Sequence, residues 1–325
     1  MENMSNKVKI PSSFPMIYID NVLAHYNKNK KLIFIKEQEF ILSENNYEIS
    51  FIIKDQMISH YFHFIEILIS LYCVWKEFFH DKIIKNIIFE YEFWNNTNQN
   101  GLQKVIISKL FNKSNIIEAN NVENMEISNC IVLDRSMSSS SINKFCEFCL
   151  RFAWKFAPEM RNEILSSFNL ECYQKEKSFR IVYVKRDPPR RLVPELEEQL
   201  FQALAEFGGV ESIDFAGKTI QEQMAISMNA DIMIGVHGNG LTNAMWLPSH
   251  GTLIELFPTG VHHYDYQLMC EIFGLRYFGL EGDLIYRESS RFGPPYGHDP
   301  HHNVPVEILN ITAIKNIVER ILFSD

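Results

Sequence analysis

A chain of 325 residues with 46% hydrophobic and 22% charged residues has the composition of an ordinary globular protein and is long enough for two domains. Its net charge of -9 argues against a nucleic-acid partner, because binding to a phosphate backbone requires a basic face. The longest apolar stretches are too short and too interrupted to span a membrane.

The first residues of the chain carry neither the apolar segment nor the small-residue cleavage site of a secretory signal. The six cysteines are irregularly spaced, and a chain of this size does not need disulfides to fold. Both features predict a cytoplasmic protein with no membrane span.

The first half of the chain is rich in Asn, Lys, Ile and Phe, and few of its elements have clear bounds. Helical spacing of apolar residues predicts helices over 55–79 and 142–168, the second after a Ser-rich loop. Buried strands are expected at IIKNIIFEYEF (83–93) and NCIVLDR (129–135). The polar segment after the second helix places the predicted domain boundary at residue 170.

From residue 179 onward, short apolar segments alternate with helical patterns. Predicted strands lie at 179–186, 211–215, 231–236, 252–257 and 276–280. Predicted helices lie between them at 194–208, 219–230, from about Leu241, and at 263–274. Strands separated by helices of this length predict an α/β fold with a doubly wound parallel sheet, which binds ligands at the carboxyl ends of its strands.

The sequence GVHGNGLTN (235–243) lies at one such strand end. The preceding strand is apolar throughout, as expected of a central strand buried on both faces. Gly238 and Gly240 leave room for a ligand, and the N–H groups of the first turn of the following helix suit a phosphate. His237 and Thr242 add side-chain donors at the same place. The turn is therefore a candidate anion-binding site.

Other interpretations fit this turn less well. A Walker loop requires Gly-Lys followed by Ser or Thr, which is absent. A dinucleotide fingerprint would need a small residue where Asn243 stands, which counts against a nicotinamide-dependent oxidoreductase. A third alternative is that the glycines only form a tight turn and His237 is a hydrogen-bonded structural residue. The convergence of anion-friendly features at one strand end favours binding.

Two further features converge on the same ligand. VKRDPPRR (184–191) leaves another parallel strand with several cations, and guanidinium groups such as Arg186 and Arg190 match phosphate oxygens without a metal. The alternative is a solvated basic turn. Glu255 interrupts the buried strand LIELF, so it either pairs with a buried cation or accepts hydrogen bonds from ligand hydroxyls such as a ribose. We favour the ligand.

In the first half, SHYFHFIEILIS (59–70) places His60, His63, Glu66 and Ser70 three and four residues apart. This spacing forms a polar stripe on an otherwise apolar helix. If the helix faces the phosphate site, Glu66 or His63 is a candidate general base. A His–Glu pair that satisfies itself is an equally good interpretation.

These motifs resemble the signature of glycosyltransferase family 61. GVHGNGLTNAMWLP followed by LIELFP is similar to the family's G-x-H-G-A-G-L-T-N and I-E-L elements, and VYVKRDPPRR and FHFIE are similar to its arginine and His-Phe motifs. The resemblance implies a GT-B fold of two Rossmann-like domains facing a cleft. We expect an acceptor-side domain over 1–170, a nucleotide-sugar-binding domain over 171–310, and a final helix over 311–325 that can pack back on the first domain.

The resemblance also implies an inverting transfer from a nucleotide sugar to a hydroxyl of a glycan acceptor. The donor would be UDP-linked, for example UDP-xylose or UDP-GlcNAc, and no cofactor or essential metal is expected. Glu66 would be the acidic residue beside the acceptor, with His63 as runner-up, and Glu255 would lie near the ribose or the sugar. The donor-binding candidates are Arg186, Arg190, His237, Gly238, Asn239, Gly240, Leu241, Thr242, Asn243 and Glu255. The alternative function is a nucleotide-sugar-binding protein without transfer activity.

The chain departs from the family pattern in three places. Asn239 replaces the usual Ala or Ser, and Glu66 follows His63 by three residues where four are expected. Eukaryotic members usually carry a membrane anchor and enter the secretory pathway, and this sequence shows neither feature. The sequence therefore predicts a bacterial or viral relative or a trimmed chain.

Overall fold

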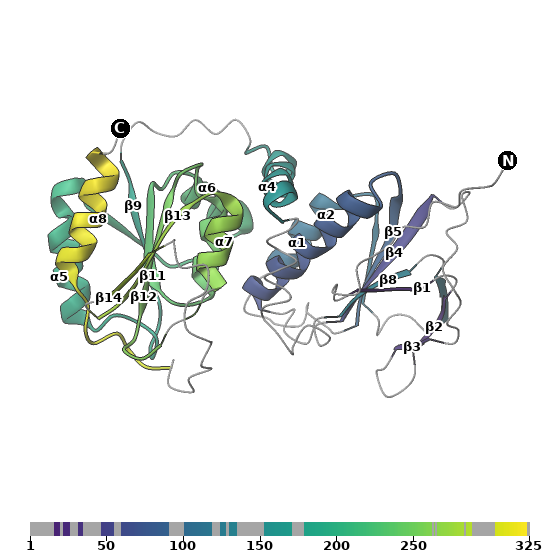
Figure 1. The fold of residues 1–325 in the computed structure, drawn as a ribbon, viewed down its shortest axis with the longest axis horizontal. Helices are drawn as coiled ribbons and strands as arrows, with labels where there is room; N and C mark the ends of the chain where they lie inside the picture. Colours follow the sequence, from purple (N-terminus) through teal and green to yellow (C-terminus); the bar gives the residue numbers. More distant parts are fainter. Residues whose placement is uncertain are drawn as a thin grey trace. The chain divides into compact units, whose positions relative to one another are not determined.

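The computed structural model of the protein describes residues 16–19, 22–26, 32–34, 47–54, 60–90, 101–118, 124–127, 130–134, 153–170, 179–261, 263, 265–282, 284–287 and 303–323. The chain divides into two compact units, Met1–Ser167 and Phe168–Asp325, close to the predicted boundary at residue 170. Each unit is an α/β structure with its own parallel-strand sheet (Figure 1).

The strands of the first unit form a five-stranded and a three-stranded sheet. The larger sheet has the order β1-β8-β4-β5-β6, and its pairs are parallel except β1 with β8. Its strands are β1 (Met16–Ile19), β4 (Glu48–Lys54), β5 (Ile83–Phe89), β6 (Asn115–Glu118) and β8 (Cys130–Asp134). The smaller sheet is antiparallel and contains β2 (Val22–Tyr26), β3 (Leu32–Phe34) and β7 (Asn124–Ile127). The strands predicted at 83–93 and 129–135 are confirmed as β5 and β8.

The helices of the first unit pack on one another through apolar side chains. Those in the described part are α1 (Tyr61–Phe78), α2 (Leu102–Leu110) and α4 (Trp154–Ser167), and α4 contacts both of the others. Lys76 of α1 donates to Glu159 and Glu163 of α4 at 2.7 and 3.2 Å. The two predicted helices are confirmed, although α1 begins only at Tyr61, and most of the second prediction before residue 153 lies outside the described residues.

The second unit contains a six-stranded sheet in the order β10-β9-β11-β12-β13-β14. Its strands are β9 (Ile181–Val184), β10 (Val210–Ile213), β11 (Ile232–Val236), β12 (Thr252–Phe257), β13 (Arg276–Glu281) and β14 (Leu284–Arg287). The first five are parallel, as predicted, and β14 adds an antiparallel edge that the sequence pattern does not reveal. Because the chain passes from β9 to β10 on one side and then to β11 on the other, the strand order reverses between β9 and β11.

Helices cover both faces of this sheet (Figure 1). On one face lie α5 (Pro194–Leu204), which η4 (Ala205–Phe207) extends, and α8 (Ile311–Phe323). On the other face lie α6 (Ile220–Met228), α7 (Asp265–Phe273) and the 3-10 helix η5 (Asn239–Trp246). Helix α6 begins at a capping box in which Thr219 and Glu222 bond each other's backbone N–H groups, which stabilises its first turn.

The last helix, α8, belongs to the second unit. Its buried residues Ile314, Ile317 and Val318 share one apolar core with side chains of α5 and of β12. The sequence resemblance led us to expect that this helix packs back on the first domain. Within its own unit, α8 packs its apolar face on α5, and its packing on the first domain stays a prediction.

The segment after β11 differs from the expected α-helix. Residues 241–247 are all buried, whereas Asn239 and Gly240 at the start of η5 are partly exposed. The narrower 3-10 helix fits the buried side chains between α6 and α7, both of which it contacts. This close packing accompanies the difference from the expected α-helix.

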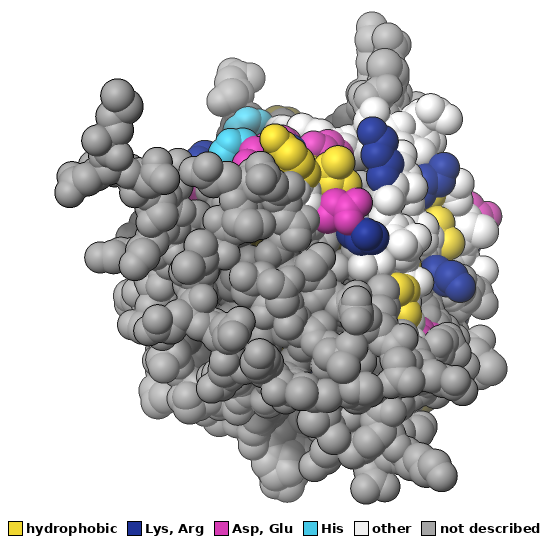
Figure 2. All heavy atoms as spheres, turned by 90° about the vertical axis from the view of Figure 1, so that its right-hand side faces the viewer, with side chains coloured by type: hydrophobic (Ala, Val, Ile, Leu, Met, Phe, Trp, Pro, Cys, Tyr) yellow, Lys and Arg dark blue, Asp and Glu magenta, His cyan; other side chains and the backbone are white. Residues whose placement is uncertain are grey.

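No helix of the described part is both long and apolar enough to cross a membrane. On the face drawn in Figure 2, the described basic and acidic side chains lie among one another instead of forming a patch of one sign. In the first unit, the charged atoms of Lys85 and Glu48 are 2.6 Å apart.

We expect Ile314→Ala to lower the free energy of unfolding by about 2–5 kcal/mol, because the side chain is fully buried between α8 and the sheet. Asn316→Ala on the exposed side of the same helix should change it by less than about 0.5 kcal/mol. Urea denaturation of the two variants measures the difference. Equal stabilities would contradict the packing described for α8.

Candidate functional site

A pocket of about 390 Å³ lies in the second unit at the carboxyl ends of β9 and β11. This is the point at which the strand order reverses, and the loops that leave such strands diverge and open a crevice. The pocket is lined by residues 184–190, residues 214–216, Asn239, Gly240 and Asn303. Its volume suits a small-molecule ligand.

Cations dominate the wall contributed by the loop after β9. Lys185, Arg186 and Arg190 line the pocket, whereas the neighbouring Arg191 is exposed and lies outside its lining. Among the described residues, no carboxylate lies within ion-pair distance of Arg186 or Arg190. Burial lowers the pKa of Arg186, and the like charge of Arg190 lowers it further. A bound anion would oppose both effects, so the wall is suited to a phosphate group.

The backbone of the turn after β11 is built around the Arg186 side chain. Its Nη1 donates a hydrogen bond to the carbonyl oxygen of His237. A Cβ atom on Gly238 would lie 1.3 Å from this same Nη1, so only glycine leaves space for the guanidinium. Gly240 lies similarly close to β9, where a Cβ would lie 2.9 Å from Cγ1 of Val184. Both glycines therefore permit the close approach of other side chains of the protein, and the room for a ligand expected from the sequence stays a prediction.

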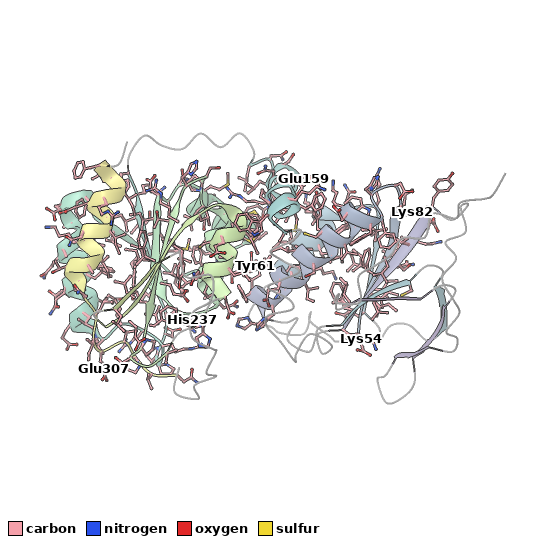
Figure 3. All side chains as sticks on the ribbon, in the orientation of Figure 1. Lys54, Tyr61, Lys82, Glu159, His237 and Glu307 are labelled. Atoms are coloured by element: carbon pink, nitrogen blue, oxygen red, sulfur yellow. The ribbon has the colours of Figure 1, made fainter. Side chains whose placement is uncertain are left out.

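His237 follows the last residue of β11, so it lies where the parallel strands of the sheet end (Figure 3). Its N–H donates to the carbonyl of Leu256 at 3.0 Å. Its ring stacks on His263, with ring centroids 4.4 Å apart and planes 15° apart, and also on Phe257. Nδ1 lies 2.5 Å from Oε1 of Glu255. The ring is thereby held in one orientation with 13% of the side chain exposed.

Glu255 lies in the middle of β12, and its side chain has no exposed surface. Besides the contact with His237, its Oε2 accepts a hydrogen bond from the Tyr277 hydroxyl at 2.7 Å. Burial raises the pKa of Glu255 to about 8, and the hydrogen bond from Tyr277 opposes that rise. Both carboxylate oxygens thus have protein partners. The contact of Glu255 with a ribose or sugar, which we inferred from the sequence, stays a prediction. To make this contact, the carboxylate would have to give up its hydrogen bond with His237 or Tyr277.

Three of the predicted donor-binding residues lie in the interior. Leu241, Thr242 and Asn243 are each at most 1% exposed. The amide Nδ2 of Asn243 donates to Gln223 at 2.9 Å, and the Thr242 hydroxyl lies close enough to Tyr266 to affect its pKa. These side chains shape the turn, and their role in donor binding stays a prediction.

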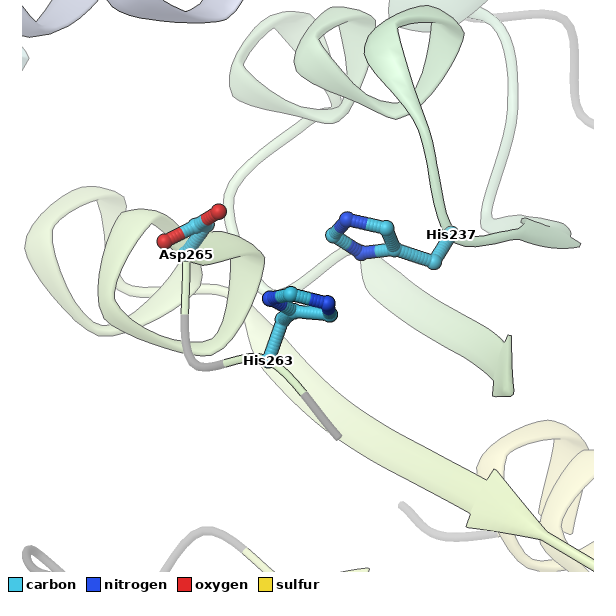
Figure 4. A group of neighbouring side chains, drawn as sticks. All are labelled: His237, His263 and Asp265. Carbon is cyan, nitrogen blue, oxygen red and sulfur yellow. The ribbon is translucent and has the colours of Figure 1, made fainter. Parts of the chain in front are cut away.

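His237, His263 and Asp265 form a cluster whose potential metal-ligand atoms lie within 4.8 Å of one another (Figure 4). A metal ion lies on the in-plane lone pair of each imidazole that binds it, and two such ligands point at one centre. The two histidine rings are instead stacked, with planes only 15° apart, and Nδ1 of His237 contacts Glu255. The arrangement does not preform a metal site, because one ring would have to rotate first.

In the first unit, α1 brings two of the predicted residues together. Nδ1 of His63 lies 2.7 Å from Oε2 of Glu66, and their side chains are 20% and 16% exposed. The His60 ring lies beside His63 at a centroid distance of 4.9 Å, and Ser70 donates to the backbone carbonyl of Glu66. The polar stripe is therefore real. Its catalytic role stays a prediction.

Sequence reasoning missed several residues around the site. Tyr277 and His263 reach Glu255 and His237 from β13 and from the segment before α7, and Asp214 and Asn303 line the pocket. Asp214 directly follows β10 and lies in the last part of the strand predicted over 211–215, so the rule that ligands bind at such ends could have identified it. No sequence signal marks the others, because their proximity depends on contacts between distant segments.

Comparison with known proteins matches residues 61–254 to the Glycosyltransferase 61 family. The chain is 45% identical over 53 residues to alpha-1,3-arabinosyltransferase XAT3 of Oryza sativa subsp. japonica, covering 15% of this chain and 9% of that protein. It is 28% identical over 149 residues to the EGF domain-specific O-linked N-acetylglucosamine transferase of Drosophila melanogaster, covering 45% of this chain and 27% of that protein. The matches thus span less than a third of either relative.

Both of these relatives are eukaryotic, so they lend no support to the bacterial or viral origin expected from the sequence. The family match begins at the first residue of α1 and ends within β12, so it includes the polar stripe, the cationic loop and the glycine-histidine turn. Because this match covers more than half of the chain, the protein belongs to the glycosyltransferase 61 family.

Proposed function

We propose that the protein is a glycosyltransferase whose second unit holds the diphosphate of a nucleotide sugar at the turn around His237. The observation that carries this proposal is the pair of guanidinium groups, Arg186 and Arg190, at the point where the strand order of a parallel sheet reverses. Neither group has a carboxylate partner among the described residues. A diphosphate supplies the missing negative charge in a form that guanidinium groups bind well.

The proposed reaction is an inverting transfer to a hydroxyl of a glycan acceptor. The acceptor oxygen forms a bond to the anomeric carbon while the bond from that carbon to the diphosphate oxygen breaks. The electron pair of the broken bond stays on the leaving diphosphate, and the hydroxyl proton passes to a base. Arg186 and His237 would stabilise the negative charge that develops on the leaving group, an effect typically worth several kcal/mol per preorganised donor.

The names of the relatives support our inference about the donor. The reported relatives are named for the transfer of arabinose and N-acetylglucosamine, and a further rice relative, 32% identical over 81 residues, for the transfer of xylose. We infer a UDP-linked pentose or N-acetylglucosamine as the donor, bound without an essential metal, and a GT-B arrangement of the two units. The sheet topology of the second unit is compatible with a Rossmann-like domain of such an enzyme.

A second candidate function is nucleotide-sugar binding without transfer. The hydrogen bond between His63 and Glu66 is the observation that favours it, because a carboxylate engaged with a histidine is what a purely structural pair requires. The same geometry also suits a base whose proton the histidine helps to accept. Substitution of Glu66 separates the two functions.

We expect Arg186→Ala and Gly238→Ala to lower UDP affinity by about tenfold or more, since the first removes a charged donor and the second displaces it. Arg191→Ala, an exposed neighbour outside the pocket, serves as the matched control and should bind UDP as the wild type does. Calorimetric titration with UDP measures these affinities, in the presence and absence of EDTA. UDP binding that survives both substitutions would place the diphosphate elsewhere, and binding abolished by EDTA would overturn the metal-independent mechanism.

We expect Glu66→Gln to reduce transfer by about 10²- to 10⁴-fold while UDP affinity stays within about twofold, because a general base acts on the acceptor and not on the nucleotide. Glu77→Gln, near the other end of the same helix, is the control. Transfer is followed as release of UDP in the presence of a glycan acceptor. Unchanged turnover of Glu66→Gln would assign the base elsewhere.

A further inference from the structure

The side chains of Tyr277, Glu255 and His237 form a continuous hydrogen-bonded chain within the second unit. The Tyr277 hydroxyl donates to Oε2 of Glu255 at 2.7 Å, and Oε1 of Glu255 lies 2.5 Å from Nδ1 of His237. Tyr277 is 1% and Glu255 0% exposed, whereas the His237 side chain retains 13% of its surface. The chain therefore begins in the interior and ends at the solvent side of the turn.

Glycines make room for this arrangement. In the register of the parallel sheet, Glu255 lies between Gly235 of β11 and Gly279 of β13. A Cβ atom on Gly279 would lie 2.8 Å from the Tyr277 hydroxyl oxygen and 3.2 Å from the Phe257 ring. The missing side chain of Gly279 thus leaves the path along which Tyr277 reaches the carboxylate.

The direction of the hydrogen bonds follows from the donors present. The Tyr277 hydroxyl that donates to Oε2 lowers the pKa of Glu255, against the rise that burial causes. In its ionised form Glu255 accepts at both oxygens, and the partner of Oε1 is Nδ1 of His237. Nδ1 then carries the proton that it donates to Oε1, and Nε2 is the second ring nitrogen.

We propose that Glu255 and Tyr277 are positioning residues, which hold the His237 ring with Nδ1–H toward Glu255 so that Nε2–H donates to the anionic leaving group. This inference rests on the proposed function, since the anion is the diphosphate of the donor. It assigns Glu255 an action through His237 instead of contact with the sugar or ribose. Tyr277 enters the site only through this structure, because no sequence motif marks it.

A double-mutant cycle tests whether Glu255 acts through His237. We expect His237→Ala to weaken binding of UDP and of inorganic pyrophosphate by about 10- to 100-fold, the worth of a hydrogen bond to a charged group. Glu255→Gln should weaken it several-fold in the wild-type background. In the His237→Ala background, Glu255→Gln should weaken binding of either ligand by no more than about twofold, because the effects of groups that act through one another are not additive.

Tyr277→Phe gives a milder variant for the case that Glu255→Gln does not fold. It should weaken pyrophosphate binding in the presence of His237 and not in its absence. Tyr183→Phe is the matched control, because it also removes a buried hydroxyl from the same sheet, in the core beside α5. The inference would be overturned if the affinity loss of a double variant equalled the product of the losses of its two single variants. Wild-type affinity in both Glu255→Gln and Tyr277→Phe would also overturn it.

A measurement without ligand separates this inference from the proposed function. In protein labelled with ¹⁵N-histidine, the ring signals of His237 are identified by their absence in His237→Ala. We expect a proton on Nδ1 in the wild type and a changed distribution between the two nitrogens in Glu255→Gln. An unprotonated Nδ1 in the wild type would overturn the positioning role even if UDP binds as proposed. Wild-type UDP affinity in Arg186→Ala would instead overturn the proposed function, and the ring signals would still decide what Glu255 does.

Discussion

A carboxylate buried in the middle of a parallel sheet is the constraint on which the rest of the site depends. Burial removes the water that would solvate Glu255, so its charged form requires a hydrogen bond at each oxygen. His237 and Tyr277 provide these contacts, one from the end of β11 and one from β13. Loss of either partner would leave a buried oxygen without that hydrogen bond, which is destabilising. The hydrogen bond with Glu255 therefore holds the His237 ring against the sheet more firmly than packing alone would.

The turn after β11 transmits this constraint to the pocket. The N–H of His237 is bonded to Leu256, its carbonyl to Arg186, and its ring to Glu255. One residue thus connects the buried strand β12 with the cationic loop that follows β9. An anion that binds Arg186 meets a backbone that the interior of the sheet already holds in place, so little ordering is needed on binding.

The sequence predicts the elements well and the contacts between them poorly, for a physical reason. Strands β9, β11 and β12 are short apolar segments with clear ends, and parallel strands bring such ends to one edge, so Arg186 and His237 could be predicted to converge. Tyr277 could not, because its distance to Glu255 depends on the register of β12 with β13 and on a glycine that clears its path. The 3-10 conformation of η5 was missed for a similar reason, since it depends on the packing of residues 241–247 between α6 and α7, which is a tertiary property.

Most residues of the motif GVHGNGLTN shape the turn, and few of them line the pocket. Gly238 makes space for an arginine from another strand, Asn239 and Gly240 line the pocket, and the buried Leu-Thr-Asn segment packs the turn against α6 and α7. Only the second of these roles brings a residue to the pocket surface. The cations that suit a phosphate come instead from the loop after β9, which is far away in the sequence. The proposed anion site at this turn therefore depends on two strand ends held side by side, and neither segment would form it alone.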